Sequence, residues 1–201
     1  MLGKRIEKWI TDSREENGDN KTIELYQEEM EFAKKRQLVG EGIKIVEKAP
    51  AGRFDDAYLE RGDKETDEFL GEENASFLDQ PIQYFKKHKN EFMYMESKWF
   101  ELVGVDAVSY EVDDVFGTYN AMLGLKLQKK FDQRIKSFFA KELGSEDARV
   151  DLMFDANEGI WNVNFALNNL AGFKEEMTIR EAYMLIYQFL FKLGEAMEKD
   201  E

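Results

Sequence analysis

Cysteine is absent from the 201-residue sequence, and histidine occurs once, at position 88. The absence of cysteine excludes disulfides, thiol nucleophiles, Cys-based zinc sites and iron–sulfur clusters. With one imidazole an HExxH zinc site cannot form, and His88 stands among lysines, where a solvated surface position is the expectation. A chain without cysteine suits a reducing compartment, so we expect a cytoplasmic protein.

Positive charge is scarce. Lys and Arg number 28 against 42 Asp and Glu, which gives a formal net charge of −14. Binding to the phosphates of nucleic acids depends on clustered Lys and Arg, so nucleic acid is not expected as a partner. The one basic cluster, Lys86, Lys87 and Lys89, is too small to outweigh the negative field of the whole chain.

Long hydrophobic runs and nucleotide-binding motifs are also missing. The most apolar stretch, residues 182–193, is far shorter than the roughly 20 residues that a transmembrane helix needs. The charged start of the chain lacks the apolar core of a secretory signal. No GxGxxG, Walker or GxSxG sequence occurs. We therefore expect neither a membrane protein nor an enzyme built on one of the large nucleotide-binding folds.

What is present is enough apolar surface for a core. Hydrophobic residues make up 43% of the chain and aromatic residues 13%, which disfavours intrinsic disorder despite the high charge. The length and the lack of an obvious linker predict a single domain over residues 1–201. Residues 53–79, which are acidic and poorly patterned, are expected to be irregular within it.

Hydrophobic periodicity predicts α+β structure in which helices dominate. Helical spacing covers residues up to a turn at 17–20, then 22–38, 82–103, 114–143 and 178–197, the last with a Thr178–Glu181 capping box. Alternation of apolar residues predicts a β-hairpin at 149–168, and 42–47 resembles a short strand. We expect five or six helices packed on a small, mainly antiparallel sheet built around the 149–168 hairpin.

The polar face of that hairpin is the first candidate site. Asparagine is uncommon in strands, yet Asn162, Asn164 and Asn168 recur at even spacing opposite Asp151. Such a row of polar side chains suits a polar ligand or a peptide. It also suits two structural roles, which are to satisfy loop backbone or to guard an edge strand.

A second candidate lies in the acidic segment. Asp55, Asp56, Glu60 and Asp63 supply the oxygen ligands that Mg²⁺ or Mn²⁺ would take, although the spacing fits no EF-hand loop. An acidic run is more often a solvated surface. No cofactor is predicted, and a divalent metal enters only if the protein is an enzyme.

The last predicted helix is apolar almost all round. One of its faces has to cover the hairpin, which leaves Met184, Leu185, Tyr187 and Phe191 to meet something else. Burial against other helices of the same chain explains these residues, and so does an interface with a second copy or another protein.

These observations favour a binding or regulatory protein over an enzyme. The leading hypothesis is a cytoplasmic, non-enzymatic protein whose acidic surface engages a basic protein partner or a second copy of itself. The alternative is a small enzyme based on carboxylates, with or without a divalent metal. Mimicry of DNA by the acidic surface is a third, weaker idea.

Overall fold

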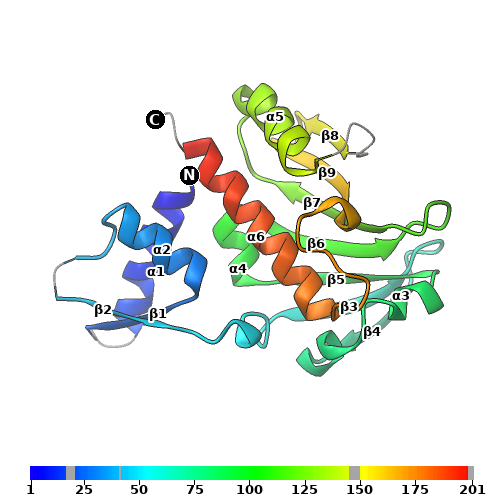
Figure 1. The fold of residues 1–201 in the computed structure, drawn as a ribbon, viewed down its shortest axis with the longest axis horizontal. Coiled ribbons are helices and arrows are strands. Elements are labelled where there is room, and N and C mark those ends of the chain that lie inside the picture. Colours follow the sequence, from blue (N-terminus) through cyan, green and yellow to red (C-terminus); the bar gives the residue numbers. More distant parts are fainter. Residues whose placement is uncertain (17–20, 41, 145–149, 199–201) are drawn as a thin grey trace.

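An antiparallel sheet of seven strands forms the centre of the fold in a computed structural model that describes residues 1–16, 21–40, 42–144 and 150–198 (Figure 1). The strand order is β4-β3-β5-β6-β7-β9-β8. The strands are β3 (Tyr58–Asp63), β4 (Phe69–Glu73), β5 (Glu91–Glu96), β6 (Val105–Val112), β7 (Tyr119–Leu125), β8 (Val150–Asp155) and β9 (Ile160–Ala166). All neighbours in this sheet are antiparallel, which leaves β4 and β8 as its two edges.

The helices are of unequal length, and the longest crosses the sheet (Figure 1). They are α1 (Leu2–Glu16), α2 (Gln27–Lys35), α3 (Tyr84–Lys87), α4 (Lys98–Val103), α5 (Asp132–Glu142) and α6 (Ile179–Glu198). Short 3-10 turns lie at η1 (Pro50–Gly52), η2 (Ala75–Asp79), η3 (Lys129–Phe131) and η4 (Leu167–Asn169). α6 contacts α1, α4 and α5, so it joins the helical layer together.

Alternating burial shows which face of the sheet carries the core. In β7, Tyr119, Ala121, Leu123 and Leu125 are buried, while the residues between them are partly exposed. β6 and β9 alternate in the same way through most of their length. Successive side chains of a strand point to opposite faces, so one face packs under the helices and the other is left open.

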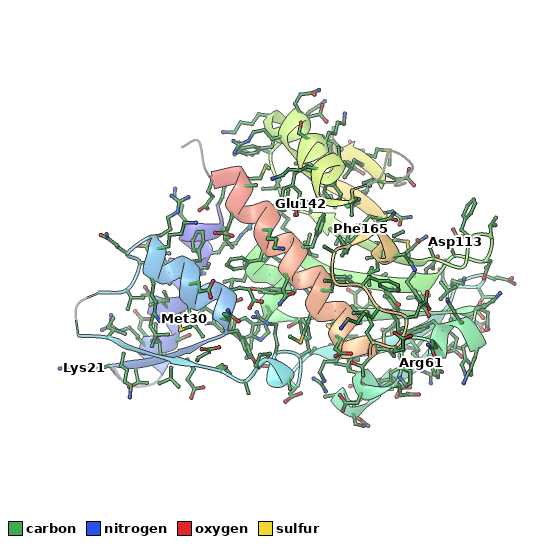
Figure 2. The ribbon with its side chains drawn as sticks, in the orientation of Figure 1. Lys21, Met30, Arg61, Asp113, Glu142 and Phe165 are labelled. Atoms are coloured by element: carbon green, nitrogen blue, oxygen red, sulfur yellow. The ribbon has the colours of Figure 1, made fainter. Side chains whose placement is uncertain are left out.

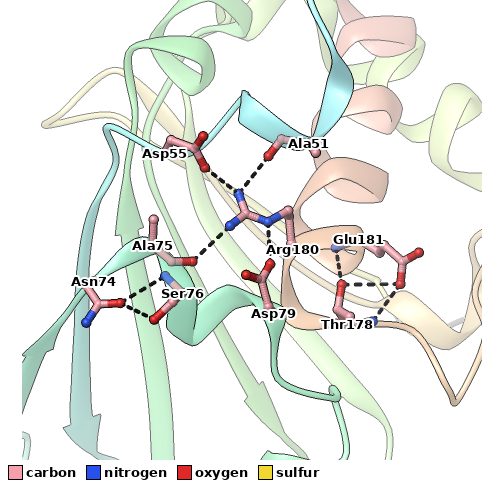
Figure 3. Close-up of polar contacts among 9 residues, drawn as sticks. All are labelled: Ala51, Asp55, Asn74, Ala75, Ser76, Asp79, Thr178, Arg180 and Glu181. Carbon is pink, nitrogen blue, oxygen red and sulfur yellow. Dashed lines mark hydrogen bonds and ion pairs between the residues drawn. The ribbon is translucent and has the colours of Figure 1, made fainter.

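The sequence signals of α6 are present as predicted (Figure 3). The backbone N–H of Thr178 donates to Glu181 Oε2 at 2.7 Å, and the N–H of Glu181 donates to Thr178 Oγ1 at 3.2 Å, which is a reciprocal capping box. The predicted apolar residues, Ile179, Ala182, Tyr183, Ile186, Phe189, Leu190, Leu193 and Met197, are all buried. The helix thus begins where its cap predicts and buries the expected face.

A buried ion cluster ties α2 and α6 to the segment that follows η1. Arg53 is 2% exposed, and its guanidinium donates to Glu29 Oε1 at 2.6 Å and to Glu28 Oε2 at 2.6 Å. The hydroxyl of Tyr187 donates to Glu29, and the side-chain amide of Gln188 donates to Glu28 Oε1 at 2.8 Å. The charged groups of this cluster are thus buried, and opposite charges and hydrogen bonds take the place of the water that they lose.

The expectation of a mostly helical protein with a small sheet is wrong. The class is α+β, but the main sheet has seven strands and helices do not dominate. The predicted hairpin is present as β8 and β9, and it lies at one edge of the sheet instead of forming its centre.

Two predicted long helices account for most of this error. Residues 82–103 form α3, β5 and α4, and residues 114–143 form β7, η3 and α5. β5 carries large apolar side chains on both faces, with Phe92 and Tyr94 on one and Met93 and Met95 on the other. The period of two is then hidden, and the apolar positions also fit helical spacing.

Other expectations near the N-terminus and in the acidic segment also change. Residues 22–38 begin as a strand, β1 (Thr22–Leu25), before α2. The predicted strand at 42–47 is present as β2 (Lys44–Glu47), but it pairs in parallel with β1 in a separate two-stranded sheet. Residues 53–79 contain β3 and β4. The predicted turn at 17–20 lies outside the described residues.

Candidate functional site

The open face of the main sheet is the candidate site. We define this open face by three rows of residues that run across the strands. The rows are Glu72, Glu60, Tyr94, Ser109, Met122, Asn164 and Asp151; Tyr58, Glu96, Ala107, Gly124, Asn162 and Met153; and Phe69, Gly62, Phe92, Glu111, Asn120 and Ala166. In the second row, a bulge in β6 between Val105 and Val108 shifts the register with β7, so Ala107 has no direct partner on that strand.

Two tyrosines and two glutamates alternate at the β3–β5 side of this face. Tyr58 lies opposite Glu96, and Glu60 lies opposite Tyr94. The hydroxyl of Tyr58 donates to Glu60 Oε2 at 2.8 Å, and that of Tyr94 donates to Glu96 Oε1 at 2.7 Å. Burial, assisted by the hydrogen bond to Glu96, raises the pKa of Tyr94 to about 12. Each phenol therefore stays protonated and lies beside a carboxylate.

Negative charge on the open face is not balanced within it. The three rows contain Glu60, Glu72, Glu96, Glu111 and Asp151 and no Lys or Arg. Lys64 and Lys126 lie near its margins, and each is paired, with Asp114 at 3.1 Å and with Asp106 respectively. The face is consequently anionic and suited to positive charge.

Two depressions hollow the β6–β9 side of the open face. One, of 510 Å³, is lined by Tyr94 and by residues of β6, β7, β8 and β9, among them Asp106, Met122, Met153 and Ile160. The other, of 370 Å³, lies toward the β6–β7 turn, where Asp113 is labelled in Figure 2, and includes Phe116 and Asn120. Asp151 and Asn164 line both depressions, so the two lie side by side.

Three of the four predicted ligand-binding residues lie together in the structure, and the fourth lies apart from them. Asp151, Asn162 and Asn164 line the larger depression together. Asn168 lies in η4, and its Oδ1 accepts a hydrogen bond from the backbone N–H of Tyr119 at 2.8 Å. The first three residues face the candidate site. Asn168 instead binds a backbone N–H group, which is one of the two structural roles expected for these asparagines.

The four metal candidates are engaged separately. Asp55 accepts from Arg180 at 3.0 Å, in a set of contacts in which Arg180 also binds Asp79 and the carbonyls of Ala51 and Ala75 (Figure 3). Asp56 pairs with Lys98, and Glu60 accepts from Tyr58.

Asp63, the fourth metal candidate, is occupied by a turn. The hydrogen bond that Asn90 donates to Oδ2, followed by those that the backbone N–H groups of Thr66 and Glu65 donate to Oδ1, lowers the pKa of Asp63. In the described part of the chain, no group of three or more His, Cys, Asp or Glu side chains is placed to hold a metal ion. The four carboxylates thus do not converge.

The interface candidates on α6 pack mostly inside the chain. Tyr187 is fully buried and reaches Glu29, and Phe191 is 4% exposed with its ring 5.8 Å from that of Phe32. Met184 and Leu185 are half-buried against the same core. These four side chains therefore pack against the chain's own core, as expected if they are buried by other helices of the same chain.

Sequence reasoning missed Tyr94, Ser109 and Met122 as members of the site. Tyr94 and Met122 were assigned to helices, and no strand was predicted at Ser109. A signal existed in residues 119–125, where Tyr, Ala, Leu and Leu alternate with Asn, Met and Gly, but Met122 next to Leu123 also fits a helix.

Within the described ranges, no helix is both long and apolar enough to cross a bilayer. Comparison of the chain with protein-family models, with curated proteins and with solved structures found no match in any of the three.

Proposed function

We propose that this is a non-enzymatic binding protein that holds a basic protein partner on the open face of its sheet. The observation that supports this proposal is the composition of the three rows, which combine Glu60, Glu72, Glu96, Glu111 and Asp151 with no Lys or Arg. Complementary charge steers association and selects partners. The lack of cysteine agrees with a cytoplasmic setting.

The tyrosines make this face more than a diffuse anionic surface. Tyr58 and Tyr94 place aromatic rings beside the carboxylates of Glu60 and Glu96. A guanidinium or ammonium group is attracted both by carboxylates and by the face of an aromatic ring. An arginine or lysine side chain of the partner is therefore the expected occupant of this corner.

The alternative of a carboxylate-based metal enzyme has less support. Its four candidate carboxylates are held by Arg180, Lys98, Tyr58 and a backbone turn. Self-association stays an alternative to a different partner, and the mass of the protein in solution distinguishes the two.

A peptide of alternating Arg and Ala tests the proposal by fluorescence anisotropy. We expect it to bind the wild-type protein with an affinity that falls as salt rises. The double variant Glu60→Gln/Glu96→Gln should bind at least about tenfold more weakly, since two charge-assisted contacts are lost.

A control variant keeps the net charge equal. Glu7→Gln/Glu101→Gln also removes two negative charges, but from exposed positions on α1 and α4. If both double variants weaken binding equally, attraction comes from net charge alone and the open face is not the site. Binding that is indifferent to salt would also contradict the proposal.

A further inference from the structure

We infer that the basic partner enters the open face as an extended segment whose main chain is held by Asn162, Asn164 and Asp151. This inference rests on the proposed function and makes it more specific. It concerns the two adjacent depressions, of 510 Å³ and 370 Å³, which we together call the asparagine groove.

The shape of the asparagine groove suits a narrow, elongated occupant. The two depressions share Asp151 and Asn164, and the groove extends from Tyr94 and Asp106 to Phe116 near the β6–β7 turn. It is lined by the small residues Ala107, Gly124 and Ala166 and by the larger apolar side chains of Met122, Met153 and Ile160. An extended polypeptide fits such a space more closely than a folded surface does.

Unused hydrogen-bonding groups line the groove. The side chains of Asp151, Asn162 and Asn164 make no hydrogen bond or ion pair with any other residue that the structure describes. A side-chain amide presents both donors and an acceptor, which are the two kinds of group that pair with peptide C=O and N–H. These residues are therefore prepared for a main chain and not only for a positive charge.

The position of β9 removes the competing explanation for its asparagines. An asparagine can guard an exposed strand edge, but β9 lies between β7 and β8 and is not an edge. Asparagine is also unfavourable inside a strand. Asn162 and Asn164 thus stand in an interior strand at some cost to stability, and their side chains make no hydrogen bond with another described residue in return.

Charge at the groove selects a basic segment. Asp151 lies within it, and Glu96 stands in the same open-face row as Asn162, whereas Asp106 at one end is paired with Lys126. In an extended chain alternate side chains point to the same side, so every second residue faces the sheet. A segment with Arg or Lys at alternate positions therefore matches both the carboxylates and the amides.

The test compares two peptides that differ only in backbone hydrogen bonding. One has alternating Arg and Ala, and the other has the same sequence with the Ala nitrogens methylated, which removes N–H donors and keeps the charge. We expect the wild-type protein to bind the methylated peptide about tenfold more weakly. We expect Asn162→Thr/Asn164→Thr to bind both peptides alike and to melt at the same or a higher temperature, since Thr suits strands better.

Asn168→Ala is the matched control, because it removes an asparagine that caps backbone outside the groove. It should lower the melting temperature and keep the discrimination between the peptides. Equal binding of both peptides by the wild-type protein overturns the inference while leaving the proposed function intact. If neither peptide binds, or if Glu60→Gln/Glu96→Gln has no effect, the proposed function fails and the inference fails with it.

Discussion

Glu29 on α2 and Glu96 on β5 belong to the same acidic chain, but their surroundings are opposite. Glu29 is fully buried, pairs with Arg53 at 2.6 Å and accepts the hydroxyl of Tyr187. Glu96 is exposed and accepts from Tyr94, and no positively charged residue stands in its row. Each of the two carboxylates accepts a hydrogen bond from its own tyrosine. Among the described residues, only the buried Glu29 also has a counter-ion.

This difference separates charges that hold the fold from charges that are available to a partner. Desolvated carboxylates need a counter-ion, and the Arg53 cluster supplies it between α2 and α6. Unpaired carboxylates side by side repel each other, so the open face gains nothing for folding from its charge. A basic partner would relieve that repulsion, which is the physical basis of the proposed function.

The largest expected effect comes from removing the counter-ion of the buried cluster. Arg53→Ala leaves Glu29 buried without a positive charge, and we expect the free energy of unfolding to fall by about 3–5 kcal/mol. Lys126→Ala breaks the exposed pair with Asp106 and should cost less than about 1 kcal/mol. Urea denaturation of the two variants measures both values. If the two variants lose similar amounts of unfolding free energy, the buried and the exposed ion pair contribute equally to stability and the comparison fails.

The sequence predicted the helical layer more accurately than the sheet. α6 was predictable because its cap residues and its apolar positions agree on one period. β8 and β9 were predictable because their apolar residues alternate cleanly around a turn-forming segment. β5 and β7 were not, since Phe92 and Met122 place apolar side chains on the open face and hide the alternation.

Part of the candidate site was predictable for the same reason. Asp151, Asn162 and Asn164 lie on the correctly predicted hairpin, and the structure brings them together. Asn168 fits the even spacing as well, but β9 ends at Ala166, so its side chain turns to the backbone of Tyr119. Tyr94 and Glu96 come from a strand that the sequence did not reveal, and pairing between distant strands cannot be deduced from local pattern.

A smaller effect is expected where two like charges face each other across β3 and β4. Glu60 and Glu72 are direct cross-strand partners, so Glu72→Lys replaces repulsion with attraction. We expect the free energy of unfolding to rise by about 0.2–1 kcal/mol and the Arg-Ala peptide to bind more weakly. Glu101→Lys on α4 makes the same change of charge at an exposed position outside the three rows and should leave peptide binding much closer to that of the wild-type protein. If the Glu72→Lys variant is more stable but binds the peptide as the wild-type protein does, the acidic residues of the open face are not part of the binding site.

The most local effect concerns the titration of Tyr94, which reports directly on the open face. Its pKa is raised to about 12 by burial and by the hydrogen bond to Glu96, whereas an unfolded tyrosine titrates near 10. The folded state therefore holds this proton more tightly. Its contribution to stability is complete below about pH 10 and is lost as pH rises through about 12. The tyrosinate absorbance of wild-type protein minus that of Tyr94→Phe isolates this transition.

Adding the Arg-Ala peptide to that titration distinguishes the two regions. Arginine stays charged at this pH, and a bound guanidinium favours the phenolate, so the Tyr94 transition should move to lower pH. Tyr187 also has a raised pKa, caused first by its burial, and lies inside the Arg53 cluster, where the peptide cannot reach it. A peptide that shifts the Tyr94 transition and leaves that of Tyr187 unchanged places the bound charge beside Glu96. If the peptide binds without moving that transition, its charge lies elsewhere and the Tyr94–Glu96 corner is not where the partner is held.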